Sequence, residues 1–303
     1  AIPSVISVSS VVCFSMSSSK PTVAFQGEYG AFSEMAARSY FGQDVTVSPQ
    51  PDFAHLFRAV ESGEATHGMV PIENTLMGSI FENNDHLLRH DLSIVGETKL
   101  RIVHNLIVNA GVTLDDIREI HSQPPALAQC VDFIQSLPNA RAVAAHDTAG
   151  AARGLRDSGD RTTAAIASRQ AAVDYSLEIL CEGIEDNHQN FTRFVVVAPE
   201  AVNPEAPAKT SIVFTLNHEP GSLYAGLGAL AERNINMMKI ESRPIAGRPF
   251  EYTFYVDIAG DQRDDLCCEA LERLESHTTT FKILGSYKEG NIVEGAVRPP
   301  LTE

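Results

Sequence analysis

Hydrophobic and polar positions follow two different periods in the first two hundred residues. Short apolar runs at 22–27 (TVAFQG) and 67–74 (HGMVPIEN) are typical of buried strands, and apolar residues recur at helical spacing over 30–42 and 52–65. Further strand and helix pairs are predicted between 120 and 180. This alternation predicts a parallel sheet covered on both faces by helices.

The C-terminal third follows a different pattern. The segment 198–209 holds Pro199, Pro204 and Pro207, which is typical of a stiff linker between domains. After it the pattern predicts strand, helix, two strands, helix and strand, the order of a ferredoxin-like fold. We expect an α/β protein with these parts: a leader or disordered segment (1–20), a first domain (21–198) with two lobes (about 21–98 plus 186–198, and about 99–185), a linker (199–209), a second domain (210–290) and a tail (291–303).

Composition narrows the classes of function. The net charge of −16 in 303 residues argues against a nucleic-acid partner, and the chain has no apolar run long enough to span a membrane. The five cysteines show no C-x-x-C spacing, so we expect reduced thiols, and neither they nor the histidines predict a metal site. Because the protein is acidic, an anionic substrate would need a local cationic patch.

Polar side chains follow several of the predicted strands. Asn74 and Thr75 end a buried strand, Ser122 and Gln129 flank a turn, and Thr148 begins a helix. Ligands of α/β proteins bind beyond the carboxyl ends of strands, which predicts a shared cleft. From spacing alone, ordinary turns and helix caps are equally good explanations.

The order of these motifs resembles a known family. FQGEYGAFSEMAA, VPIENTLMGSI, IHSQPPALAQC, HDTAGAA and NFTRFVVVA resemble prephenate dehydratase, and EPGSLYAGLGALAERNINMMKIESRP resembles its regulatory ACT domain. The resemblance implies a two-lobed, periplasmic-binding-protein-like catalytic domain followed by a βαββαβ ACT domain. It also implies decarboxylating dehydration of prephenate to phenylpyruvate, a step in phenylalanine synthesis, without cofactor or metal.

The resemblance also assigns residues. Thr192 would donate a hydrogen bond to the departing hydroxyl, and Arg193 would pair with a substrate carboxylate, or else form a salt bridge between lobes. Strand alternation places Thr192 and Phe194 on one face and Arg193 on the other. The other expected substrate contacts are Asn74, Thr75, Ser122, Gln129, Thr148 and Phe194, and the expected phenylalanine site comprises Gly221, Ser222, Leu223, Glu241, Ser242, Arg243 and Pro244.

One motif departs from the family pattern, and several alternatives stay open. The family's Ser-His-Pro-Gln is Ser122-Gln123-Pro124-Pro125 here, so that histidine and glutamine are missing. The substrate could be arogenate instead of prephenate, and a noncatalytic amino-acid sensor is a rival of another class. We expect phenylalanine as effector, a homodimer or homotetramer formed through the ACT and catalytic domains, and a cytoplasmic location, or a plastid in a plant or alga.

Overall fold

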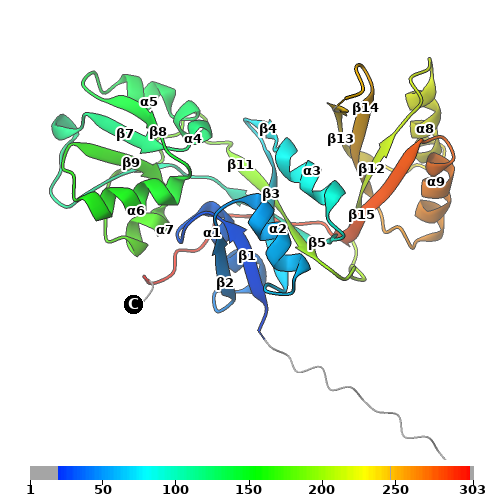
Figure 1. The fold of residues 1–303 in the computed structure, drawn as a ribbon, viewed down its shortest axis with the longest axis horizontal. Helices are drawn as coiled ribbons and strands as arrows, with labels where there is room; N and C mark the ends of the chain where they lie inside the picture. Colours follow the sequence, from blue (N-terminus) through cyan, green and yellow to red (C-terminus); the bar gives the residue numbers. More distant parts are fainter. Residues whose placement is uncertain (1–19, 246, 301–303) are drawn as a thin grey trace, which may run out of the picture.

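The computed structural model describes residues 20–245 and 247–300. Figure 1 shows a central lobe in blue and cyan, a second lobe in green and a C-terminal domain in yellow to orange at the other side. Except for Lys20, the expected leader lies outside the described residues. None of the described helices is long and apolar enough to cross a membrane.

The first lobe is built on a mixed sheet. Its strand order is β16-β5-β11-β3-β1-β2, with β4 beside β3. Strands β1 to β3 are parallel, but β11 runs antiparallel to both β3 and β5, so the expectation of a wholly parallel sheet was wrong. The elements are β1 (Thr22–Gln26), α1 (Phe32–Phe41), β2 (Thr46–Gln50), α2 (Phe53–Glu61), β3 (His67–Asn74), β4 (Gly78–Ser79), α3 (Phe81–Arg89), β5 (Ser93–Arg101), β11 (Phe191–Ala198) and β16 (Ile292–Val293).

Helices cover both faces of this sheet. Phe194 and Val196 pack with α1, whereas Val195 and Val197 pack with α2 and α3 on the opposite face. Both sets are buried because successive strand residues point to opposite faces. This explains why β11 continues as an unbroken apolar run.

The second lobe has its own sheet, in the order β10-β6-β9-β7-β8. The chain enters it between β5 and β6 and leaves it between β10 and β11, so two crossings join the lobes. The helical segment that follows β7 is divided into α4 and α5, since Cys130 leaves helical geometry. The elements are β6 (Asn105–Val108), η1 (Leu114–Asp116), β7 (Glu119–Ser122), α4 (Pro124–Ala128), α5 (Val131–Gln135), β8 (Arg141–Ala144), α6 (Thr148–Ser158), β9 (Thr163–Ala167), α7 (Arg169–Asp174) and β10 (Glu178–Cys181).

The C-terminal domain has the predicted βαββαβ order, with the antiparallel sheet β13-β14-β12-β15. Helices α8 and α9 cover one face, and the other face packs against the first lobe through Val213, Tyr255 and Leu284. The two-lobed α/β plan with a ferredoxin-like domain is therefore confirmed. The elements are β12 (Ala208–Thr215), α8 (Ser222–Ala231), β13 (Met237–Pro244), β14 (Tyr252–Ala259), α9 (Asp265–Glu275) and β15 (Thr280–Lys288).

A buried ion cluster joins this domain to the first lobe. Arg193 on β11 donates from Nε to Glu97 (2.6 Å), from one terminal nitrogen to Asp257 (2.5 Å) and from the other to the hydroxyl of Tyr287 (2.8 Å). Lys209 also donates to Glu97. Burial would raise the pKa of Glu97, but the charges of Arg193 and Lys209 hold that pKa below its usual value. We call Arg193, Glu97, Lys209, Asp257 and Tyr287 the Arg193 cluster.

The segment expected as a tail packs back onto both lobes. After β16, the buried guanidinium of Arg298 binds Glu34 on α1 (2.8 Å) and Asp174 on α7 (2.7 Å). Because α1 belongs to the first lobe and α7 to the second, Arg298 connects the lobes.

Replacing Arg193 by Met should destabilise the protein strongly. The substitution leaves Asp257 charged and buried without its ion-pair partner, which costs about 3–5 kcal/mol, while Glu97 keeps Lys209. Thermal unfolding should show a lower midpoint. Arg141→Met, which removes an exposed ion pair, is the control and should leave the midpoint nearly unchanged. Equal midpoints for both variants would show that the cluster contributes little.

Candidate functional site

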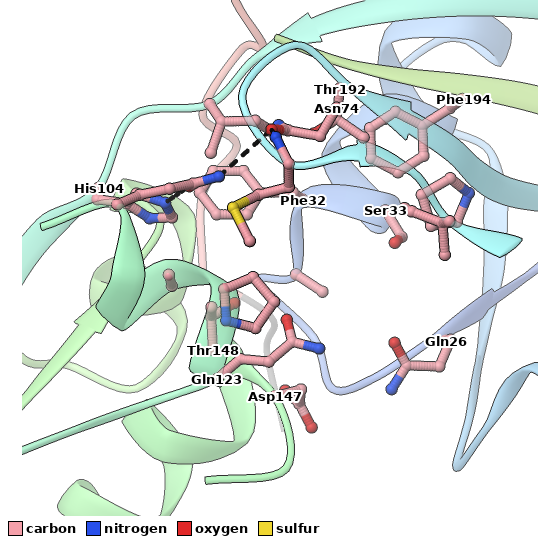
Figure 2. A pocket seen from close by; sticks show the side chains of 18 of the residues that line it. Gln26, Phe32, Ser33, Asn74, His104, Gln123, Asp147, Thr148, Thr192 and Phe194 are labelled. Atoms are coloured by element: carbon pink, nitrogen blue, oxygen red, sulfur yellow. Dashed lines mark hydrogen bonds between the residues drawn. The ribbon is translucent and has the colours of Figure 1, made fainter. Parts of the chain in front are cut away.

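A cavity of about 240 Å³ lies between the two lobes. Strand ends, helix starts and the crossing segment line it, as Figure 2 shows from close by. The first lobe contributes Gln26, Phe32, Ser33, Asn74, Thr192 and Phe194, the second lobe Gln123, Gln129, Asp147 and Thr148, and the crossing segment Ile102 and His104.

The structure brings five of the expected substrate residues to this cavity: Asn74, Gln129, Thr148, Thr192 and Phe194. Three others lie elsewhere. Ser122 is fully buried and donates to the carbonyl of Ile166, and the hydroxyl of Thr75 donates to the carbonyl of Gln189. Arg193 points away from the cavity, and its guanidinium is occupied within the Arg193 cluster. The expected pairing of Arg193 with a substrate carboxylate was wrong, because strand alternation turns it to the opposite face of the sheet.

The Thr192 hydroxyl is held by a neighbouring amide. Nδ2 of Asn74 donates to Thr192 Oγ1 over 3.0 Å, and the two residues are paired in the β3–β11 ladder. The Oδ1 of Asn74 accepts from the backbone N–H groups of Leu76 and Met77, which fixes the orientation of its amide. Since Thr192 Oγ1 accepts from Asn74, the threonine proton remains available to a ligand in the cavity.

Gln129 connects this pair to His104. Its Oε1 accepts from Asn190 Nδ2 (2.9 Å) and lies 2.8 Å from His104 Nε2, while its Nε2 donates to Asn74 Oδ1 (3.3 Å). With Oε1 as acceptor, the assigned tautomer of His104 carries its proton on Nε2. Burial lowers the pKa of His104, so the ring is held neutral. The network is rigid because each amide has fixed partners.

The beginnings of α1 and α6 face the cavity with different caps. No side chain caps α1 at Ala31, so N–H groups of its first turn stay available beside the cavity. At α6, Asp147 Oδ1 already accepts from the N–H of Gly150 (2.6 Å). The start of α6 is therefore partly filled by the protein's own carboxylate, and the start of α1 is the better position for an anion.

The charge of the cavity wall is also unexpected. Among the described residues, no lysine or arginine lines the cavity, and Asp147 contributes a carboxylate. The cationic patch expected for an anionic substrate is not in this wall. Carboxylates would be bound here by amide side chains, hydroxyls and the start of α1.

Several lining residues were missed by the sequence analysis. Gln26 ends β1 and Ser33 lies in the first turn of α1. A strand end and a helix start are the sequence signals that could have identified these two residues. His104 gave none, because it lies in an apolar crossing segment. Gln123, noted only as a departure from the family pattern, faces the cavity.

The expected phenylalanine-binding residues lie in two places within one chain. Ser222 and Leu223 line a small cavity at the start of α8. On β13, Glu241 accepts from Ser79 (3.1 Å), and Arg243 pairs with Asp85 (2.6 Å) in the first lobe. The β13 residues thus contact β4 and α3, close to the cavity residues Met77 and Ile80. Among the described residues, no cluster of His, Cys, Asp and Glu is suited to hold a metal.

The chain is similar to known proteins over most of its length. Residues 23–202 match the family model described as prephenate dehydratase. A protein of Arabidopsis thaliana named arogenate dehydratase/prephenate dehydratase 2, chloroplastic, is 42% identical over 280 residues, covering 89% of this chain and 73% of that protein. A bifunctional chorismate mutase/prephenate dehydratase of Stutzerimonas stutzeri is 36% identical, covering 88% of this chain and 72% of that protein.

Solved structures extend the likeness to the whole fold. Prephenate dehydratase from Arthrobacter aurescens in complex with L-Phe has a TM-score of 0.81 at 33% identity, covering 88% of this chain and 90% of that one. GqqA, described as a novel type of quorum quenching acylase, has a TM-score of 0.79 at 35% identity, covering 88% of this chain and 97% of that one.

The buried, neutral His104 should make stability depend on pH. A group whose pKa is lowered on folding contributes stability that is complete above its unfolded pKa, about 6.5, and is lost as the pH falls towards the folded pKa. The thermal midpoint of the native protein should therefore fall more steeply between about pH 7.5 and 5.5 than that of His104→Gln, which keeps a donor for Gln129. His121→Gln, at a more exposed position, is the control and should retain the native slope. A native slope in His104→Gln would contradict this prediction.

Proposed function

Because this chain belongs to the prephenate dehydratase family, we propose that it catalyses the decarboxylating dehydration of prephenate to phenylpyruvate, with arogenate as the second candidate substrate. One observation carries the proposal: the hydroxyl group of Thr192 lines the cavity and accepts a hydrogen bond from Asn74, which leaves its proton available to a substrate.

The reaction needs little beyond a positioned donor. The bond from the ring to its carboxylate breaks to release CO2, and the electron pair enters the ring as the C4–O bond breaks. The departing hydroxide takes a proton and leaves as water, and the ring becomes aromatic. Thr192 is too weak an acid to protonate it unaided, so its role is a hydrogen bond that strengthens as charge develops on the leaving oxygen.

The rest of the cavity suits this chemistry. Phe32, Phe194 and Met77 give it a largely apolar wall, in which the ring carboxylate is less solvated than in water. The uncapped start of α1 and the amides of Gln26 and Gln123 supply donors for carboxylates without a full positive charge. This arrangement orients the substrate while leaving the carboxylate that departs free of a strong ion pair.

Alternative functions are distinguished by assay. Arogenate differs from prephenate by an amino group in place of the keto group, and the name of the Arabidopsis relative includes both substrates. GqqA is described as an acylase, so a similar fold can carry another activity, and acylase activity belongs in the same set of assays. A noncatalytic amino-acid sensor would bind amino acids and release no product.

Phenylalanine is the proposed effector, as the complex of the Arthrobacter aurescens protein with L-Phe supports. Glu241 and Arg243 contact the first lobe at β4 and α3, so an effector that engages them alters contacts next to the cavity. This is inhibition only if phenylalanine binds two arrangements of the protein unequally.

The proposed oligomer forms through an edge of the C-terminal sheet. Strand β13 is an edge strand, and Met237, Met238 and Ile240 on it are 36–40% exposed. Pairing two such edges would cover these side chains. Whether dimers pair further into tetramers stays a prediction, as does the location in cytoplasm or plastid; the Arabidopsis relative is named chloroplastic.

Thr192→Ala should lower kcat by roughly 100- to 1,000-fold, the usual loss when one donor to a developing oxyanion is removed. Thr192→Ser keeps the hydroxyl and should retain most of the rate. The measurement is product formation, with phenylpyruvate followed by its absorbance in base, and thermal unfolding confirms that both variants fold. Native rates in Thr192→Ala would remove the proposed role of this hydroxyl.

Phenylalanine should inhibit the native protein, and Arg243→Met should reduce that sensitivity because Arg243 belongs to the proposed effector segment and pairs with Asp85 of the first lobe. The rate is measured while phenylalanine is titrated into the millimolar range. Arg273→Met, at an exposed position on α9, is the matched control and should be inhibited like the native protein. An unchanged native rate across the titration would rule out feedback by phenylalanine.

A further inference from the structure

The cavity has two polar ends. Figure 2 shows Thr192 and Asn74 at one end, and Gln26, Gln123 and Asp147 at the other. In prephenate and arogenate the departing hydroxyl is on C4 of the ring, and the three-carbon side chain is on C1, directly opposite. A substrate whose hydroxyl reaches Thr192 therefore extends its side chain towards Asp147.

One carboxylate oxygen of Asp147 makes no hydrogen bond to the described residues at this end of the cavity. The residue is 9% exposed, and its Oδ1 accepts from the N–H of Gly150. No hydrogen bond joins its Oδ2 to residues 20–245 and 247–300, and Asp147 lines the cavity. This oxygen can therefore accept a hydrogen bond from a ligand bound there.

Gly27 brings the first lobe against this carboxylate. A Cβ placed on Gly27 would lie 3.6 Å from Asp147 Oδ1, so the backbone at the end of β1 passes close to this carboxylate. Asp147 is therefore enclosed by Gly27 on one side and by the start of α6 on the other.

The charges around Asp147 determine which substrate side chain suits its end of the cavity. No lysine or arginine among the described residues lines the cavity, and burial keeps His104 neutral. Prephenate carries two carboxylates and a keto group, which can only accept hydrogen bonds and would face Asp147 with repulsion. Arogenate carries the same carboxylates and an ammonium group, which donates.

We propose that Asp147 is a specificity-determining residue, whose free oxygen accepts a hydrogen bond from the ammonium group of arogenate and disfavours the keto group of prephenate. The inference rests on the proposed function and adds the substrate class that the site prefers. Gln26 and Gln123, on either side, are placed to donate to the carboxylate of the same side chain.

The alternative is that Asp147 serves only as the cap of α6. Asn and Ser cap helices about as well as Asp, so Asp147→Asn and Asp147→Ser keep the cap and remove the charge. A purely structural role predicts that both substrates are affected equally. Selection of the ammonium group predicts that the ratio of kcat/KM for arogenate to that for prephenate changes.

The experiment measures kcat/KM for both substrates with the full chain, detecting phenylalanine from arogenate and phenylpyruvate from prephenate. We expect the native protein to favour arogenate, and the ratio to fall at least about tenfold in both variants, mainly through a higher KM for arogenate. Asp52→Asn, at an exposed N-cap whose side chain accepts from His55, is the matched control and should keep the native ratio.

The outcomes separate the two claims. A native protein that converts either substrate, together with an unchanged ratio in the Asp147 variants, overturns the role of Asp147 and leaves the proposed function standing. A native preference for prephenate also overturns it. A folded native protein that converts neither substrate overturns the proposed function, and the specificity inference falls with it.

Discussion

Strand β11 serves two sites because successive residues point to opposite faces of its sheet. Thr192 and Phe194 face the cavity between the lobes, and Arg193 between them enters the buried cluster with Glu97 and Asp257. The position of the Thr192 hydroxyl thus depends on a strand whose next residue is held by the C-terminal domain. Neither site can shift along the strand without disturbing the other.

This arrangement joins the C-terminal domain to the cavity by two routes. The first is the Arg193 cluster, in which opposite charges are buried together and therefore resist separation. The second is the contact of Glu241 and Arg243 with β4 and α3, next to cavity residues Met77 and Ile80. Packed interfaces of this kind switch between discrete arrangements more readily than they deform, which is what regulation through the domain requires.

On the proposed function, the cavity binds an anionic substrate without lysine or arginine among its described lining residues. Amide groups, hydroxyls and the first turn of α1 supply partial positive charge, while the only carboxylate in the described wall, Asp147, sits opposite the Thr192 end. A full ion pair on the ring carboxylate would stabilise the group that has to leave. Weaker dipolar contacts bind the substrate without opposing that step.

Local sequence was sufficient for the element pattern and for five of the residues in the cavity. The βαββαβ order and the strand end at Asn74 depend on spacing and on turn chemistry within a few residues, which the chain carries in its own order. Strand alternation even placed Arg193 on the face opposite Thr192.

The sequence could not show which residues that opposite face contacts. Asp257 and Tyr287 lie far along the chain, His104 enters the cavity only because β5 passes into a second lobe, and Ser122 is turned towards Ile166. Those outcomes depend on the packing of whole domains, and a charged or polar side chain has the same local signature whether its partner is a substrate or another part of the protein.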